Sequence, residues 1–111
     1  MKAKKPFWPL DRAKAHAAQG AIYVMRGRAR QFFTSDVEMY EAAVATMASL
    51  TVREYSDRSD QTDVCDIYGF MRAGGGWMIK IYIDEKVPEL TVVSFHPLER
   101  PLKTNKGWLK P

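Results

Sequence analysis

The stretch Gly76-Trp-Met-Ile-Lys-Ile-Tyr-Ile-Asp84 and the later run Leu90-Thr-Val-Val-Ser-Phe-His96 decide how this chain folds. Both runs alternate in character, which predicts two β-strands joined by a short turn. Successive side chains of a strand point to opposite faces. One face of the first strand is uniformly apolar and belongs in a core: Trp77, Ile79, Ile81 and Ile83. The other face includes a cation and a phenol: Met78, Lys80, Tyr82 and Asp84.

The second run ends on a titratable imidazole, that of His96. Strict alternation places three other side chains on its face: Leu90, Val92 and Ser94. A sheet with one apolar face and one cationic, hydroxyl-bearing face is compatible with a simply solvated surface and with a surface that handles phosphate. Both interpretations stay open at this point.

The chain has the size and composition of one ordinary globular domain. Of its 111 residues, 46% are hydrophobic and 27% are charged, which suits one modest core. We expect a single domain over residues 1–111, with an irregular basic lead-in (1–9), a compact core (10–96) and an irregular basic tail (97–111). No apolar run approaches the roughly 20 residues that span a bilayer, so we expect no membrane partner.

Cysteine and histidine usage limits the possible chemistry. Cys65 is the sole cysteine, so no internal disulfide can form, as is typical of proteins in a reducing cytoplasm. The basic N-terminus lacks the apolar segment of a secretory signal, and we expect a cytoplasmic protein. The two histidines and one cysteine show no paired ligand spacing, so we expect no metal and no cofactor.

Positive charge gathers at both ends of the chain. Residues 1–33 hold eight Lys and Arg against Asp11 alone, residues 97–111 hold four against Glu99 alone, and the net charge is +4. This pattern predicts a polyanionic partner, either a nucleic acid or an acidic protein. Simple solvation explains the lysines of residues 2–5 equally well.

Two helices are expected before the strands. An Ala-rich segment (10–19) follows Pro9, and Gly20 provides its end. Ser35 and Glu38 have the spacing of a capping box, which predicts the start of the second helix. The predicted core stripe of that helix is Val37, Tyr40, Val44, Met47 and Ala48.

Four strands are expected after the helices. They are predicted at residues 50–56, 64–72, 76–84 and 90–96, with a polar loop at 57–63 and a glycine turn at 73–76. Residues 22–25 form a further short, β-prone segment. This order predicts an α+β fold in which two N-terminal helices pack on one face of a four-stranded, mainly antiparallel sheet.

Five short segments together form a pattern that resembles a known family. They are Gln19-Gly20, Glu54-Tyr-Ser-Asp57, Asp66-Ile-Tyr68, Met78-Ile-Lys-Ile81 and Val92-Val-Ser-Phe-His96. In order and spacing they resemble the MqsR toxins, the motility quorum-sensing regulator toxins, which have the RelE-like bacterial toxin fold. The resemblance covers roughly residues 12–96. It implies a small messenger RNA endonuclease, sequence-specific or ribosome-assisted, that needs no metal and is neutralised by a protein antitoxin.

The resemblance also implies a reaction. Such enzymes use the RNA 2′-hydroxyl as nucleophile, a base to activate it, cations to hold the phosphate and an acid to protonate the leaving 5′-oxygen. The chain departs from the MqsR pattern at four positions, where the family has Lys, Gln, Tyr and Lys and this sequence has Leu50, Cys65, Met78 and His96. Several other RelE-like toxins place a histidine near the end of the last strand.

Three side chains are expected to take part in catalysis. His96 is the strongest candidate, because an imidazole can serve as general acid or base. Lys80 is expected to neutralise the scissile phosphate, and Arg53 to bind it through the guanidinium. In the plainer alternatives, His96 caps the sheet edge and Lys80 is solvated. Arg53 then pairs across the strands with Glu54 or Asp66.

Five further side chains are expected to bind the RNA substrate: Tyr55, Tyr68, Arg72, Tyr82 and Trp108. Tyr82 suits a phosphate or a base, and Trp108 in the basic tail suits stacking. Tyr68 is equally suited to packing, and the tail to docking on the domain. The glycines at 74–76 lack the following Lys-Ser/Thr and helix of a phosphate loop, which predicts a hairpin turn.

The leading hypothesis is therefore a metal-independent endoribonuclease toxin whose partners are RNA and a protein antitoxin. A non-catalytic regulator on the same fold, which binds nucleic acid or protein, is the second hypothesis, and the four departures are its main support. An immunity-type inhibitor is the third.

Overall fold

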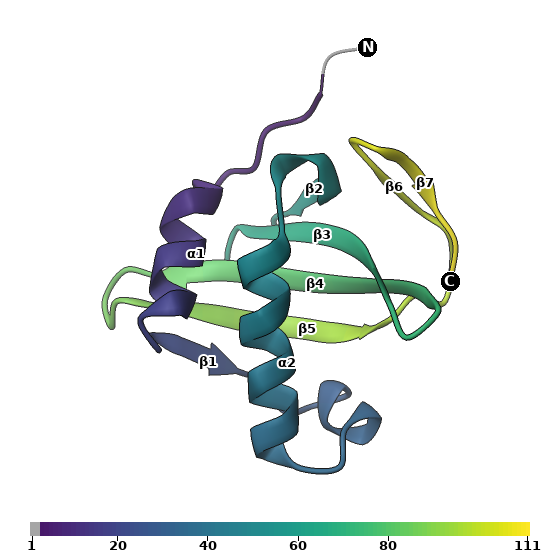
Figure 1. The fold of residues 1–111 in the computed structure, drawn as a ribbon. Helices are drawn as coiled ribbons and strands as arrows, with labels where there is room; N and C mark the ends of the chain where they lie inside the picture. The colour runs from purple at the N-terminus through teal and green to yellow at the C-terminus, as the bar shows by residue number, and fades with distance from the viewer. Residues whose placement is uncertain (1–2) are drawn as a thin grey trace.

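The computed structural model describes residues 3–111, which form an α+β fold with two helices on one face of a five-stranded sheet (Figure 1). The helices are α1 (Leu10–Ala18) and α2 (Asp36–Ser49), and two 3₁₀ turns are η1 (Ala29–Phe32) and η2 (Val52–Glu54). The strands of the sheet are β1 (Ile22–Val24), β2 (Tyr55–Ser59), β3 (Cys65–Arg72), β4 (Gly75–Asp84) and β5 (Glu89–Pro97). A separate hairpin consists of β6 (Leu102–Thr104) and β7 (Gly107–Leu109). None of the described helices is long and apolar enough to span a bilayer.

The sheet has one strand more than predicted. Its order is β1-β5-β4-β3-β2, and all neighbours are antiparallel except β1 and β5, which are parallel. The short β-prone segment at 22–25 supplies the additional strand at the edge of β5. Ile22 and Val24 are buried and Tyr23 is exposed, so even three residues follow the alternation of a half-buried strand.

Both helices begin where the sequence predicts. α1 follows Pro9, and Gly20 stands just beyond its end with a φ of +79°, a left-handed conformation that favours glycine. The Ser35 hydroxyl accepts a hydrogen bond from the backbone N–H of Glu38 (3.0 Å). The Glu38 carboxylate contacts Thr34, so only half of the predicted capping box is formed at Ser35.

The helix α2 faces the core with a different stripe from the one predicted. Its buried side chains are Met39, Ala43, Thr46 and Met47. Of the predicted stripe, Met47 is fully buried but Val37 is 65% exposed. Helices α1 and α2 contact each other, and both contribute buried alanines. Small side chains at a helix contact permit a close approach, and the larger Val37 and Tyr40 remain outside.

The core lies between the helices and the sheet. Its aromatic centre is Phe95, whose ring centroid lies 5.4 Å from that of Trp77, 5.5 Å from Phe33 and 6.2 Å from Phe70. The predicted apolar face of β4 is confirmed, since Trp77, Ile79, Ile81 and Ile83 are at most 6% exposed. Stacked and tilted ring pairs of this kind add to the stabilisation from buried area.

A β-bulge in β5 changes which residues share a face. Lys80 pairs with Ser94 and Ile81 pairs with Val92, so Val93 is an additional residue without a partner in β4. Leu90 and Val92 lie in the core, and after the bulge Phe95 lies in the core as well. The prediction that His96 shares the face of Leu90 and Val92 is therefore wrong, because strict alternation does not hold across a bulge.

The segment before β2 also differs from the prediction. Leu50 is buried next to the end of α2, residues 52–54 form η2, and the strand begins only at Tyr55. Thr51 caps η2: its hydroxyl accepts from the Arg53 N–H (3.2 Å), and the Glu54 carboxylate accepts from the Thr51 N–H (2.7 Å). A local capping box of this kind competes with an extended conformation. The strand β2 therefore begins later in the sequence than predicted, and it includes residues 57–59 of the predicted loop.

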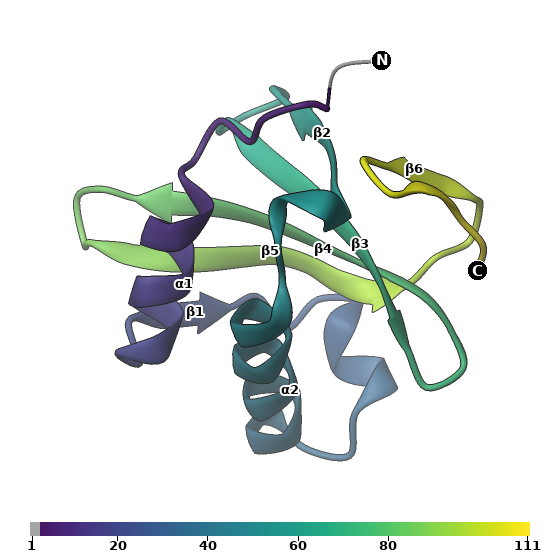
Figure 2. The ribbon, with the colours of Figure 1, turned by 45° about the horizontal axis from the view of Figure 1, so that its top comes forward.

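The tail, which was predicted to be irregular, forms the hairpin β6–β7 against the sheet (Figure 2). Gly69 of β3 makes this contact possible, because a Cβ atom there would lie only 2.8 Å from Leu102 Cδ2. Of the predicted basic lead-in, residues 1 and 2 lie outside the described part of the chain. Residues 3–9 contain no helix or strand, as predicted.

Candidate nucleic-acid interface

The candidate site lies on the outer face, the face of the sheet opposite the helices. We define the outer face by Ile67, Gly69, Met78, Lys80, Tyr82, Ser94 and His96. Lys80 stands between Ile67 of β3 and Ser94 of β5, and in the next row Met78 stands between Gly69 and His96. Directly opposed side chains on neighbouring strands are about 5 Å apart at Cβ. Ser94, which sequence reasoning missed, is therefore a direct neighbour of Lys80, and His96 lies one row further along, in a diagonal position about 7–8 Å away.

The environment of Lys80 leaves its charge available for a ligand. Lys80 is half-buried and forms no ion pair with any residue from 3 to 111. It lines a hollow of about 320 Å³ together with Tyr82, Cys65 and the loop residues 61–63. Burial raises the pKa of the Cys65 thiol, and the charge of Lys80 offsets only part of that effect. The charge of Asp63, which lines the same hollow, also raises the pKa of the thiol, and the thiol is thus kept protonated.

The ring of His96 is held in one tautomer. Its Nδ1 lies 2.8 Å from the carbonyl oxygen of Pro97. A carbonyl oxygen only accepts hydrogen bonds, so Nδ1 carries the proton in this contact and Nε2 of the neutral ring keeps its lone pair. His96 is half-buried on the outer face, and its Nε2 has the electronic form of a general base.

Two of the predicted substrate-binding tyrosines lie in the core. Tyr55 and Tyr68 are 2% and 0% exposed, and Tyr68 pairs with Ile79, on the side of the sheet that the helices cover. Burial and the charge of Asp66 raise the pKa of both phenols. Neither side chain can contact a ligand bound at Lys80, because the sheet lies between them. Tyr82 does lie on the outer face, as predicted.

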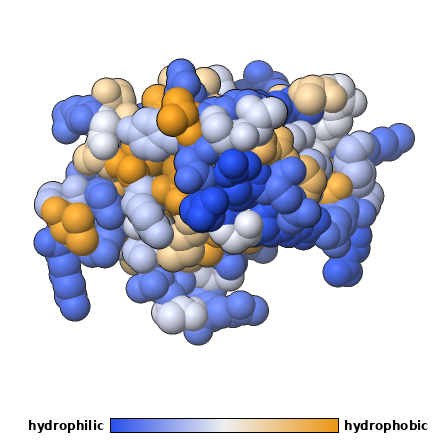
Figure 3. Space-filling view, turned by 90° about the horizontal axis from the view of Figure 1, so that it is seen from below, coloured by the Kyte–Doolittle hydropathy of each residue, from blue (hydrophilic) through white to orange (hydrophobic). Residues whose placement is uncertain are grey.

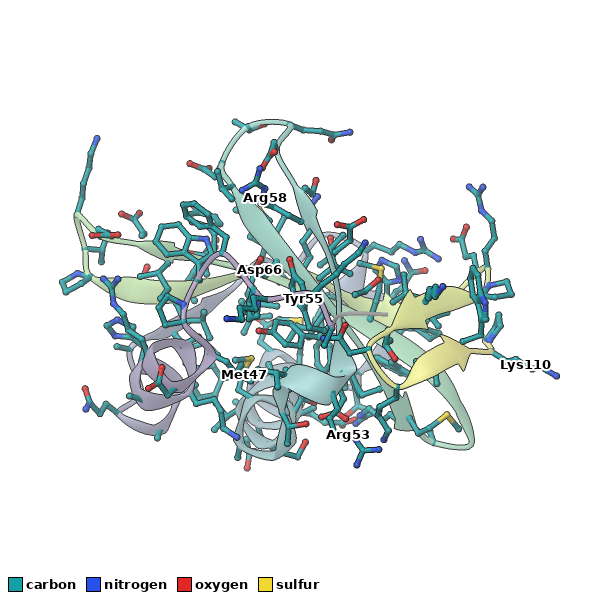
Figure 4. All side chains as sticks on the ribbon, turned by 90° about the horizontal axis from the view of Figure 1, so that it is seen from above. Met47, Arg53, Tyr55, Arg58, Asp66 and Lys110 are labelled. Atoms are coloured by element: carbon teal, nitrogen blue, oxygen red, sulfur yellow. The ribbon has the colours of Figure 1, made fainter. Side chains whose placement is uncertain are left out.

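Asp66 has a structural role that the sequence did not indicate. Its carboxylate is fully buried and accepts hydrogen bonds from the Tyr55 hydroxyl (3.1 Å) and from the backbone N–H groups of Phe7 (3.0 Å) and Trp8 (2.7 Å). Figure 4 shows Tyr55 and Asp66 close together near the middle of the view. This carboxylate fastens the lead-in to the sheet.

The predicted arginines also lie away from Lys80. The Arg72 guanidinium lies over two aromatic rings at the end of the core face. Its Cζ is 4.7 Å from the ring centroid of Trp77 and 5.0 Å from that of Phe33. Arg53 lies in η2 rather than in a strand, and its side chain extends to the side of the sheet on which the helices lie (Figure 4). Arg53 and Lys80 were both expected at the scissile phosphate, and the structure does not bring them to one face, because η2 precedes β2 and leaves the plane of the sheet.

Much of the N-terminal positive charge is already neutralised within the chain. Arg26 and Arg30 pair with Asp36, at 3.0 Å and 2.8 Å, and Arg28 pairs with Glu99. Figure 3 views this end of the molecule and shows strongly hydrophilic side chains gathered in the middle of the face. Exposed pairs contribute little to stability, but they reduce the attraction of this segment for a polyanion.

Trp108 lies on the hairpin, with its side chain 69% exposed. The predicted alternatives for the tail, docking on the domain and exposure of the indole, are both realised: Leu102 and Leu109 of the hairpin approach Gly69, whereas Trp108 points away. Among residues 3–111, no group of three or more His, Cys, Asp or Glu side chains could hold a metal ion.

The positions that differ from the MqsR pattern fall in two environments. Leu50 and Cys65 are buried, at 1% and 5% exposure, whereas Met78 and His96 are cross-strand neighbours on the outer face. Of these four positions, only His96 therefore offers acid–base chemistry on an accessible surface. Comparisons of the chain with protein-family models, with curated proteins and with solved structures find no match.

Proposed function

We propose that this protein is a metal-independent endoribonuclease toxin of the RelE/MqsR type, active in the cytoplasm and inhibited by a protein antitoxin. The β-bulge at Val93 is the observation that carries the proposal. It turns His96 and Ser94 out of the core and brings them to the face of Lys80. A bulge beside an active site commonly re-aims a side chain in this way.

The reaction follows from the chemistry of these two side chains. His96 Nε2 removes the proton of an RNA 2′-hydroxyl, and the 2′-oxygen forms a new bond to the adjacent phosphorus. The bond from phosphorus to the 5′-oxygen breaks, and the leaving oxygen takes a proton from solvent. The Lys80 ammonium stabilises the negative charge that develops on the phosphoryl oxygens. The products are a 2′,3′-cyclic phosphate and a 5′-hydroxyl end.

A cleavage assay tests this proposal. Purified protein is incubated with labelled single-stranded RNA in the presence of EDTA, and the product ends are identified by mass. We expect His96→Ala to lower the rate about 100-fold or more and Lys80→Ala to lower it about 100-fold. His16→Ala and Lys86→Ala are the matched controls, since they remove the same residue types from α1 and from the β4–β5 turn. Full activity of His96→Ala would refute the mechanism.

Expression of the wild-type chain is expected to arrest bacterial growth, and coexpression with the product of a neighbouring open reading frame is expected to restore it. The support for an acidic protein partner is Lys80, which lies half-buried on the outer face and forms no ion pair within residues 3–111. Growth that is unaffected by expression at a level verified on a gel would argue against a toxin.

A non-catalytic binding protein is the second candidate function. It is favoured by Leu50 and Cys65, because at two of the four positions at which the sequence departs from the family pattern a buried, uncharged side chain replaces the Lys or Gln of that pattern. In this case RNA binds in a salt-dependent manner that requires Lys80, but no product ends appear and His96→Ala has no effect.

A further inference from the structure

The hairpin β6–β7 lies beyond the part of the chain that resembles the toxins, and it is rigidly attached to the sheet. The Ser56 hydroxyl donates to the carbonyl oxygen of Lys103 (2.6 Å), and the backbone N–H of Asn105 donates to the carbonyl oxygen of Tyr55 (2.9 Å). The backbone N–H of Lys106 donates to the carbonyl oxygen of Arg53 (3.0 Å). Backbone-mediated attachment of this kind fixes the orientation of whatever the hairpin presents.

The hairpin presents an aromatic ring and a cation on its solvent side. Lys103 and Trp108 are direct cross-strand partners, and the Lys103 ammonium lies 5.9 Å from the centroid of the indole ring. The flanking Leu102 and Leu109 point the other way, toward Gly69. Lys103 forms no ion pair with any described residue. At 69%, Trp108 is the most exposed of the large hydrophobic residues in the described part of the chain, and tryptophan is a residue type enriched at interfaces.

A hollow connects this hairpin to the outer face. It has a volume of about 630 Å³ and is lined by Lys103, Lys106 and Trp108 on the hairpin and by Ile67 on the sheet. Ile67 is the direct cross-strand neighbour of Lys80, and neighbouring strands are about 4.8 Å apart. Through Ile67, one wall of the hollow therefore stands next to the strand position of Lys80, and the lining also includes the ion pair of Lys4 with Asp57 (3.3 Å).

We propose that the hairpin is a nucleobase-stacking subsite for single-stranded RNA. Trp108 holds the base of a nucleotide adjacent to the one at Lys80, and Lys103 contacts the phosphate of that nucleotide. A cation beside an exposed aromatic ring is the combination by which proteins bind single strands, because every base has a face that can stack. This inference rests on the proposed function, to which it adds a second point of substrate contact and a preference for unpaired RNA.

Binding measurements on the full chain test the subsite. The probe is a fluorescently labelled, ten-nucleotide single-stranded RNA whose 2′-hydroxyls are methylated, so that binding is measured without cleavage. We expect Trp108→Ala to weaken binding about 5- to 100-fold, and Trp108→Phe to stay within about 3-fold of wild type. Lys103→Ala is expected to lower the slope of log affinity against log salt by about one. Val87→Ala, which alters an exposed apolar side chain in the β4–β5 turn, is the matched control.

The outcomes separate this inference from the nuclease proposal. If wild-type protein cleaves unmodified RNA and Trp108→Ala binds the probe as tightly as wild type, the subsite is refuted and the nuclease stands. If the probe binds in a Trp108-dependent manner and no cleavage occurs, the subsite stands and the nuclease fails. If wild-type protein does not bind the probe, or binds a fully paired duplex equally well, the subsite is refuted. Thermal unfolding of Trp108→Ala at the wild-type temperature verifies that the fold is intact.

Discussion

The two faces of the central sheet share the same strands but differ in what holds their side chains in place. On the helix-covered face, Phe95, Tyr68 and Ile79 are inaccessible to solvent. On the outer face, Lys80, Ser94 and His96 are only half-buried and extend from the same strands. The covered face is rigid because its side chains are packed on all sides. The outer face shares the same strand backbones, which the packed core holds in place, while its polar groups stay accessible. A binding or catalytic site requires this combination of a fixed backbone and accessible polar groups.

The substitutions Phe95→Ala and Met71→Ala compare the loss of a side chain on the covered face with the loss of an exposed one. Phe95 contacts three other aromatic rings and is fully buried, so we expect a loss of about 3–5 kcal/mol in the free energy of unfolding. Met71→Ala is the control on β3, since Met71 is 63% exposed and pairs with Gly76, and we expect less than about 0.5 kcal/mol. Urea titrations measure both values, and similar losses would contradict the difference between the faces.

A pair of Tyr→Phe substitutions sharpens the description of the covered face. Tyr55 donates a hydrogen bond to the buried Asp66, whereas the hydroxyl of Tyr68 is buried without a partner among the described residues. We expect Tyr55→Phe to destabilise by about 1–2 kcal/mol, and Tyr68→Phe to be neutral or stabilising, because no hydrogen bond is lost. The two rings pack edge to face at 5.3 Å, which makes them matched controls. Equal losses measured in urea would contradict the hydrogen-bond assignment.

The smallest expected effect concerns Glu54, which joins the sheet to the hairpin. Burial tends to raise its pKa, but hydrogen bonds from Thr51 and the ion pair with Lys106 (3.5 Å) outweigh burial and hold the pKa below its ordinary value. A carboxylate with a lowered pKa stabilises the fold above its unfolded-state pKa of about 4.3, and this stabilisation is lost as the pH falls through the folded-state value. Glu54→Gln should therefore be less stable than wild type at pH 7, by up to about 1 kcal/mol.

Melting temperatures at pH 7 and pH 3 provide the measurement for Glu54. The difference between wild type and Glu54→Gln should shrink toward pH 3, where the carboxyl group of the wild-type protein becomes neutral as well. An unchanged difference at both pH values would show that Glu54 acts through packing rather than through its charge.

Local sequence patterns predicted the main helices and strands correctly. They failed where the orientation of one element depends on its contacts with another. The alternation of residues 76–84 predicted the core face of β4 correctly, and Ser35 predicted the start of α2. The stripe of α2 was misplaced, because its orientation depends on contacts with α1. Tyr55 and Tyr68 were expected at the site and lie in the core, because a tyrosine in a strand suits either face and the partners that fix the choice come from distant segments.

By itself, the sequence determined the α+β class, the positions of both helices, the apolar face of β4 and the presence of Lys80 on the opposite face. These properties follow from the hydrophobic periodicity of single helices and strands, which can be recognised from residues close together in the sequence. Only the tertiary structure decided that β1 joins β5, that the basic tail folds into a hairpin over Gly69, and that His96 lies on the same face as Lys80. A bulge, a parallel strand and a docked hairpin each depend on pairing with residues far along the chain. No local pattern specifies that long-range pairing. The long-range pairing is nevertheless what brings the residues of the outer face together.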